Sequence, residues 1–239
     1  MVNTKQTTFR HGYGTGDIPQ WAWLYFPIAL IAIQLMALEF LEYETYYKLI
    51  DTEFGLIESL TALFAFFAII TGCRIWSIRS NFPTIKYNAY IILLILGSIY
   101  TLGEEISWGQ HYMGWGTPEW LADVNVQNET NLHNAHDIFG VHPKMFLEWS
   151  IYICGIFLTL KFRKNNSIFD PQTDWKYWIL PSFIIFPSAV LALLFRVTDR
   201  IETWFRLDFK IAAGETHECL LLFIILLYML SLHKRLKQY

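Results

Sequence analysis

The sequence predicts an all-α protein: a bundle of six transmembrane helices with an interfacial or re-entrant segment between the third and fourth helices. Three observations predict this fold class. Of the 239 residues, 54% are hydrophobic and only 16% are charged, whereas a soluble domain carries about 25% charged residues. The apolar residues form long runs, close to the roughly 20 residues that a helix needs to cross a bilayer. These runs lack the strict alternation of barrel strands, so helices are favoured.

Six segments meet or approach this length, and tryptophans gather at their ends, as interfacial aromatic residues do. The residues before Trp21 lack the charged region, short apolar core and cleavage site of a signal peptide. We therefore expect a cytoplasmic N-terminal tail, residues 1–20, and a single integral membrane domain, residues 21–239. The predicted spans are Trp21–Phe40, Phe54–Trp76, Tyr87–Glu105, Met145–Leu160, Tyr177–Arg196 and Ile211–Leu232.

The charged residues are divided unequally between the two sides of the predicted bundle. An even number of spans puts both termini on one side, and that side holds 12 of the 18 Lys and Arg but only 3 of the 21 Asp and Glu. We call it the basic side, and the other the acidic side. Lys and Arg in short loops remain in the cytoplasm. We therefore expect a bacterial inner-membrane protein with cytoplasmic termini, whose acidic side faces the periplasm or the exterior.

Acidic residues fall inside the acidic-side ends of several predicted helices. An ionised carboxylate near hydrocarbon costs a few kcal/mol, so it needs a bound cation, a basic partner or a proton. Two interpretations stay open: these acids point into water at the interface, or they line a polar basin inside the bundle. The polar residues placed inside the membrane boundary are Glu58, Glu104, Glu105, Glu148, Glu215, His217 and Glu218.

The segment between the third and fourth helices is rich in groups that bind metals. If the stretch NETNLHNAHD is helical, Glu129, His133, His136 and Asp137 share one face, at positions i, i+4, i+7 and i+8. Such a set suits zinc or iron, or calcium or manganese if the carboxylates dominate. A single Glu-x-x-x-His pair is more often a surface pair. The indication of a site comes from the coincidence of several such groups at one membrane face.

The adjacent Glu104 and Glu105 resemble the pairs that hydrolytic metal sites use, with one carboxylate as a ligand and one as a general base. We expect Glu104, Glu105 and His133 to be catalytic, with Glu104 as the candidate base. The expected ligands of a divalent metal ion are Glu105, Glu129, His133, His136, Asp137 and Glu218. The expected substrate-binding residues are Glu58, Gln110, His111, Asn134, Arg196, Glu215 and His217.

Arg196 has two open roles: it binds an anionic headgroup, or it pairs with one of the many carboxylates.

Two blocks of this sequence, GEEISWGQ and NVQNETNLHN, carry a resemblance. The chain resembles a group of uncharacterised bacterial multi-pass membrane proteins that share G-E-E-I-S-W-G-Q and N-x-Q-x-E-x-N-L-H-N blocks. The resemblance covers about residues 103–134, and no activity is attached to that group. The E-E-x-x-x-R motif of CAAX-protease-like membrane enzymes is not matched, because Gly109 stands where the arginine is required.

Three functions fit this sequence. The first is a membrane-embedded metal-dependent enzyme, a hydrolase or transferase that acts on a lipid, lipid-linked or membrane-anchored substrate from the non-cytoplasmic side. The second is a cation or proton-coupled transporter or channel, since intramembrane acids are typical of ion paths. The third is a non-catalytic sensor or assembly subunit. A homo-oligomer is compatible with all three. No basic patch indicates nucleic-acid binding.

Overall fold

The computed structural model describes residues 9–10, 18–50, 52, 55–123, 130–131, 141–165 and 167–239. Over these residues it is a bundle of long helices, with one two-stranded sheet formed by β1 (Phe9–Arg10) and β2 (Ile168–Phe169). Six helical stretches among them are long and apolar enough to cross a membrane. The chain is a multi-pass membrane protein.

The first three spans follow the predicted boundaries closely. A π-helical segment, η2 (Trp21–Tyr25), leads into α1 (Phe26–Phe40), and the short helix α2 (Tyr43–Ile50) then connects to α3 (Leu56–Ser77). The 3-10 turn η3 (Arg79–Asn81) precedes α4 (Lys86–Glu105). Helix α2 was not predicted; its apolar residues Tyr46 and Ile50 lie on one face and are buried, while its other residues are exposed.

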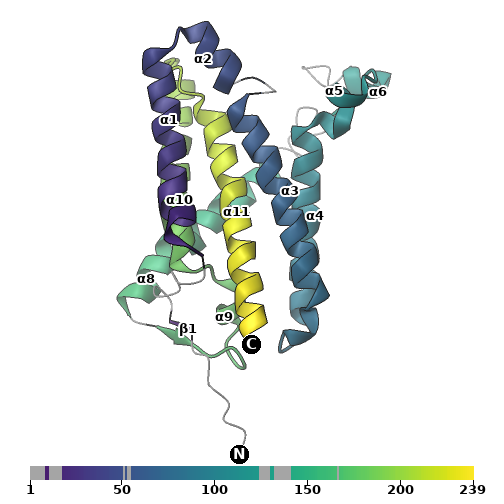
Figure 1. The fold of residues 1–239 in the computed structure, drawn as a ribbon, viewed down its shortest axis with the longest axis vertical. Coiled ribbons are helices and arrows are strands. Elements are labelled where there is room, and N and C mark those ends of the chain that lie inside the picture. Colours follow the sequence, from purple (N-terminus) through teal and green to yellow (C-terminus); the bar gives the residue numbers. More distant parts are fainter. Residues whose placement is uncertain are drawn as a thin grey trace, which may run out of the picture.

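The segment after α4 contains three short turns of helix. They are the 3-10 turn η4 (Ser107–Gly109), α5 (Gln110–Met113) and α6 (Glu119–Ala122). Short helices thus lie between the third and fourth spans, and the interfacial or re-entrant position of this segment stays a prediction. Figure 1 shows α2, α5 and α6 at the same end of the bundle, which is the acidic side.

The fourth span is longer than predicted and contains a π-helix. It runs through α7 (Val141–Ile151), the π-helix η5 (Tyr152–Leu158) and α8 (Thr159–Lys164), whereas the sequence predicts Met145–Leu160. Such π-helical segments are rare in proteins, and those that occur often lie at functional sites. The side chain of Thr159 donates a hydrogen bond to the Cys154 carbonyl at 2.9 Å, which satisfies one backbone acceptor of this wider turn.

The fifth span is broken, which corrects the continuous helix predicted over Tyr177–Arg196. It consists of α9 (Trp175–Ile179), an extended turn that contains Pro181, the 3-10 turn η6 (Phe183–Ile185) and α10 (Phe186–Phe205). Proline lacks a backbone N–H and disfavours a helical conformation in the residue before it. Leu180 accordingly leaves the helix with a ψ of 137°.

Buried polar side chains bind the carbonyl groups that this break releases. The guanidinium of Arg235, 1% exposed, donates to the carbonyls of Tyr177 and Leu180. The hydroxyl of Tyr228 donates to the carbonyls of Trp178 and Ile179, at 3.1 Å each. Non-helical backbone at membrane depth requires such internal partners. The break is thus a stable part of the fold at the basic side.

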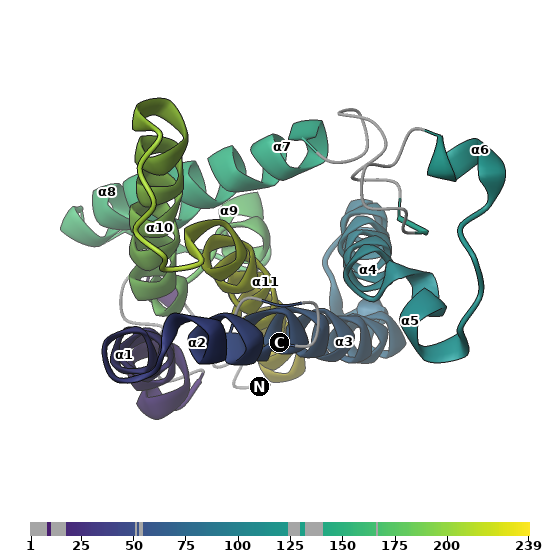
Figure 2. The same cartoon turned by 90° about the horizontal axis from the view of Figure 1, so that it is seen from above.

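The last span, α11 (Ala213–Gln238), is the centre of the bundle. It packs against α3 and α10, and α3 packs in turn against α4. Figure 2 shows α11 surrounded by α1, α3, α4, α7 and α10. Nearly all of its residues from Cys219 to Leu227 are buried. The polar residues on its first two turns are therefore held at the centre of the acidic side.

Candidate functional site

Four carboxylates from three helices converge at the acidic side. Glu105 ends α4, and it lies within electrostatic range of Glu58 on the first turn of α3 and of Glu215 and Glu218 on the first turns of α11. We call these four residues the acidic basin. Of the two interpretations of the intramembrane acids, the structure supports the common polar basin for these four residues.

Among the described residues, Lys144 supplies a cation to the acidic basin. Its ammonium, carried by α7, forms an ion pair with Glu218, and it is also within electrostatic range of Glu105. The side chains of Lys144 and Glu218 are 28% and 33% exposed, so the pair is reached from the surface. Sequence reasoning did not select Lys144. The sequence does indicate this residue, because Lys144 is one of few basic residues on the acidic side.

A second polar cluster lies next to the basin, around the fully buried His217. Its Nε2 atom is 3.0 Å from the hydroxyl oxygen of Tyr152, the first residue of the π-helix η5. The same atom is 3.9 Å from Oε1 of Glu148. The Nδ1 atom of His217 has no hydrogen-bond partner among the described residues. One ring nitrogen of a buried histidine thus remains available for a further hydrogen bond.

Arg196 connects this cluster to α10. Its two terminal nitrogens lie 3.1 Å from Oε1 of Glu148 and 2.9 Å from Oδ2 of Asp199. The Arg196 side chain is 15% exposed and that of Glu148 is 7% exposed. Of its two expected roles, Arg196 has the carboxylate pairing. Glu148 is also within electrostatic range of Lys144 and Glu218, so the second cluster and the acidic basin form one polar region.

Glu104 contacts other residues than its neighbour Glu105 does. Successive residues of a helix are about 100° apart around its axis, so the two side chains leave α4 in different directions. The Glu104 carboxylate is 4% exposed and accepts hydrogen bonds from the Trp108 indole, at 2.6 Å, and from the Tyr100 hydroxyl. The two glutamates therefore have different partners.

The backbone after Glu105 is strained. Three consecutive residues have positive φ angles: Ser107 at 45°, Trp108 at 52° and Gly109 at 92°. For residues other than glycine this conformation costs roughly 1–2 kcal/mol each. The turn folds the Trp108 ring back onto α4, where a Cβ atom on Gly103 would lie 2.8 Å from three ring atoms. The pattern G-E-E-I-S-W-G thus encodes a tight turn that seats Trp108 against Gly103.

Gln110 connects this turn to residues further along the segment between α4 and α7. Its side-chain amide donates to the Thr117 hydroxyl at 3.0 Å, and its Oε1 atom accepts the backbone N–H of Thr130. Asn131, the next residue, is 1% exposed. Gln110, expected to bind substrate, makes two contacts within the chain.

Several expected site residues lie outside the described part of the chain. For His111 this applies to the side chain only. Their roles stay predictions. Among the residues that are described, no group of three or more His, Cys, Asp and Glu side chains has an arrangement that would hold a metal ion. The residues outside the description are His111, Glu129, His133, Asn134, His136 and Asp137.

An apolar layer lies next to the polar region, on the side toward the middle of the bundle. Residues Cys219 to Leu227 of α11 are apolar, which amounts to about 13 Å of helix at 1.5 Å per residue. The rings of Phe26, Phe64 and Phe223 pack on one another at the same depth, with centroid separations of 5.1 to 6.0 Å. This layer separates the acidic basin from the polar contacts of Tyr228 and Arg235.

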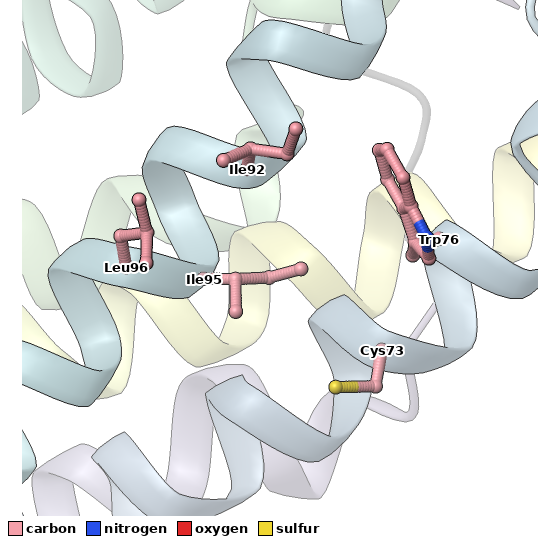
Figure 3. Close-up of a pocket in the computed structure, with 5 residues that line it drawn as sticks. All are labelled: Cys73, Trp76, Ile92, Ile95 and Leu96. Atoms are coloured by element: carbon pink, nitrogen blue, oxygen red, sulfur yellow. The ribbon is translucent and has the colours of Figure 1, made fainter.

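An open apolar pocket lies between α3 and α4, nearer the basic side. Figure 3 shows the side chains that line it, which are Cys73, Trp76, Ile92, Ile95 and Leu96. None of the five carries a charge. The pocket is separate from the polar region and offers mainly apolar contacts.

Comparisons with known proteins add no family to this description. No protein-family model matches the chain, and neither a curated protein nor a solved structure matches it. The resemblance carried by the two sequence blocks therefore stays a prediction.

Proposed function

We propose that this protein is a membrane-embedded, metal-dependent enzyme, a hydrolase or transferase that acts on a lipid, lipid-linked or membrane-anchored substrate from the acidic side. The observation that carries the proposal is the convergence of Glu58, Glu105, Glu215 and Glu218 around Lys144 at one end of the bundle. In the part of the chain that the structure describes, these four carboxylates and the Lys144 ammonium give the basin an excess of negative charge close to hydrocarbon. Such an excess favours the binding of a cation.

A metal ion in this region would polarise a substrate oxygen or activate a water molecule. Glu105 and Glu218 supply two carboxylate ligands from different helices. The described residues contain no third metal ligand close enough to these two. The segment between α4 and α7, called the connecting segment below, therefore has to supply the remaining ligands. Glu129, His133, His136 and Asp137 are its candidates there.

A one-sided pocket favours an enzyme over a channel. Among the described residues, the apolar layer from Cys219 to Leu227 and the phenylalanine cluster beside it lie between the acidic basin and the polar contacts of Tyr228 and Arg235. Ion paths instead need polar or hydrated groups along their length. Membrane substrates reach a basin at the acidic side without crossing this layer.

The test is the metal content of the full-length protein, purified in detergent without chelators. We expect stoichiometric divalent metal in the wild type, its loss in Glu105→Gln/Glu218→Gln, and its retention in Glu44→Gln, which changes an exposed acid of α2. Metal-free wild-type protein whose thermal stability does not respond to zinc, manganese, iron or calcium would remove the proposal.

The broken fifth span favours one alternative, a transporter. Discontinuous helices build substrate and ion sites in many transporters, and Tyr90, Tyr228 and Arg235 form polar contacts next to this break. The released carbonyls already have these partners, which is why we rank this function second. Cation or proton flux into liposomes that hold the purified protein, abolished by Glu58→Gln or Glu218→Gln, would reverse the ranking.

A further inference from the structure

Glu104 is a buried carboxylate of the third span, and two of its contacts come from residues one turn before and one turn after it on the chain. Its carboxylate accepts the Trp108 indole N–H at 2.6 Å and the Tyr100 hydroxyl, and Glu104 itself is 4% exposed. A carboxylate that accepts two hydrogen bonds in a buried position is held in one orientation. A general base, in contrast, needs to reach the proton of a bound substrate or water molecule.

The contact to Trp108 determines the path of the chain after α4. Ser107, Trp108 and Gly109 adopt left-handed conformations, and such strain persists only where surrounding contacts hold it. The Trp108 ring lies on Gly103, where any larger residue would overlap it. The hydrogen bond to Glu104 and this close packing are two of the contacts that hold the turn.

The turn positions two groups of the proposed site. Glu105 immediately precedes it and lies within range of the other acids of the basin. Gln110 immediately follows it and binds the backbone N–H of Thr130, the residue after the candidate ligand Glu129. One rigid turn therefore connects the basin to the returning part of the connecting segment.

We infer that Glu104 is a positioning residue: with Trp108 and Tyr100 it fixes the turn 106–109, and thereby sets the places of Glu105 and Gln110. This inference rests on the proposed function for the meaning of the site, but its geometry is independent of any metal. It differs from the general-base role expected for Glu104, which stays a prediction.

Conservative variants test the positioning role. Gln at position 104 keeps an oxygen that accepts the Trp108 N–H, whereas Ala does not, and Phe at position 108 keeps a ring but has no N–H. We expect hydrogen–deuterium exchange of residues 106–123 to rise roughly tenfold in Glu104→Ala and Trp108→Phe, as for the loss of a typical hydrogen bond. Glu104→Gln is expected to match the wild type, and so is Tyr25→Phe, which changes an exposed ring of the first span.

Metal content, measured on the same preparations, gives the second readout. We expect Glu104→Gln to retain the wild-type metal content and Glu105→Gln to lose it. The inference is overturned if Glu104→Gln loses metal as Glu105→Gln does, or if Trp108→Phe leaves exchange of residues 106–123 unchanged. If the wild type holds no metal, the proposed function fails, while the exchange experiment still decides the role of Glu104. Gel filtration of each variant identifies any that do not fold.

Discussion

The Nε2 atom of His217 lies 3.0 Å from the hydroxyl oxygen of Tyr152, across 65 residues of sequence. The contact joins the start of the π-helix η5 to the second turn of α11, next to the acidic basin. It gives a fully buried imidazole one partner and leaves its Nδ1 atom without one among the described residues.

Removing this hydroxyl is expected to destabilise the protein. In Tyr152→Phe the ring still fills its space, but His217 loses the hydrogen bond of a buried nitrogen, which costs about 1–3 kcal/mol. We expect the thermal midpoint in detergent to fall by several degrees. Tyr25→Phe, which removes an exposed hydroxyl, is the control and should not change the midpoint. Equal midpoints for Tyr152→Phe and the wild type would contradict this role of the contact.

Neutralising the cation of the basin is expected to make stability depend on added cations. Lys144→Met leaves Glu218 and Glu105 without the Lys144 ammonium, so the repulsion among the acids of the basin rises. We expect a lower thermal midpoint that millimolar divalent metal restores more strongly than in the wild type. Lys144→Met/Glu218→Gln should recover part of the loss without metal. A midpoint that metal leaves unchanged in Lys144→Met would count against a cation site.

Two glycines of the spans, Gly72 on α3 and Gly97 on α4, differ in how closely their neighbours pack. A Cβ atom on Gly72 would lie 2.5 Å from Cγ1 of Ile95 and 2.8 Å from Cε of Met229, whereas a Cβ on Gly97 meets nothing within 4 Å. Overpacking of this kind costs about 1–3 kcal/mol. We expect Gly72→Ala to lower the thermal midpoint. Gly97→Ala should raise it slightly, since alanine favours helix by about 1 kcal/mol.

The partners of the broken span predict the effect of substitutions at the basic side. Arg235→Met leaves the carbonyls of Tyr177 and Leu180 without their guanidinium donor, at a cost of about 1–3 kcal/mol for each buried acceptor. We expect a large fall in the thermal midpoint and faster hydrogen exchange in residues 175–185. Lys237→Met removes a nearby exposed charge and should change neither measurement. Similar behaviour of the two variants would show that Arg235 does not hold the break.

The sequence was sufficient to predict the six spans, because length and apolarity alone determine which segments can cross a bilayer. It was less informative about local geometry. Pro181 was visible inside the fifth segment, yet a hydropathy window averages over it. Arg235 was counted as an ordinary basic-side charge, because its use as a donor depends on a break 55 residues away in the sequence.

The acids of the basin were predicted from the cost of carboxylates near hydrocarbon, and Glu58, Glu105, Glu215 and Glu218 do converge. The roles of individual residues were harder to predict. Neighbours such as Glu104 and Glu105 share a motif but face different surroundings, which only the positions of Trp108 and Tyr100 reveal. Tyr152 gave no signal at all, since a tyrosine in an apolar helix has the pattern of ordinary membrane packing.

The apolar layer next to the acidic basin affects how the basin exchanges ions and protons with the two sides of the membrane. Under the proposed function, ions and protons that enter from the acidic side meet the leucine, isoleucine and phenylalanine side chains of this layer, so occupation of the basin is expected to carry no charge across the membrane. Its charge state would follow the salt and acidity of the compartment it opens to, and would be indifferent to those of the compartment beyond this layer.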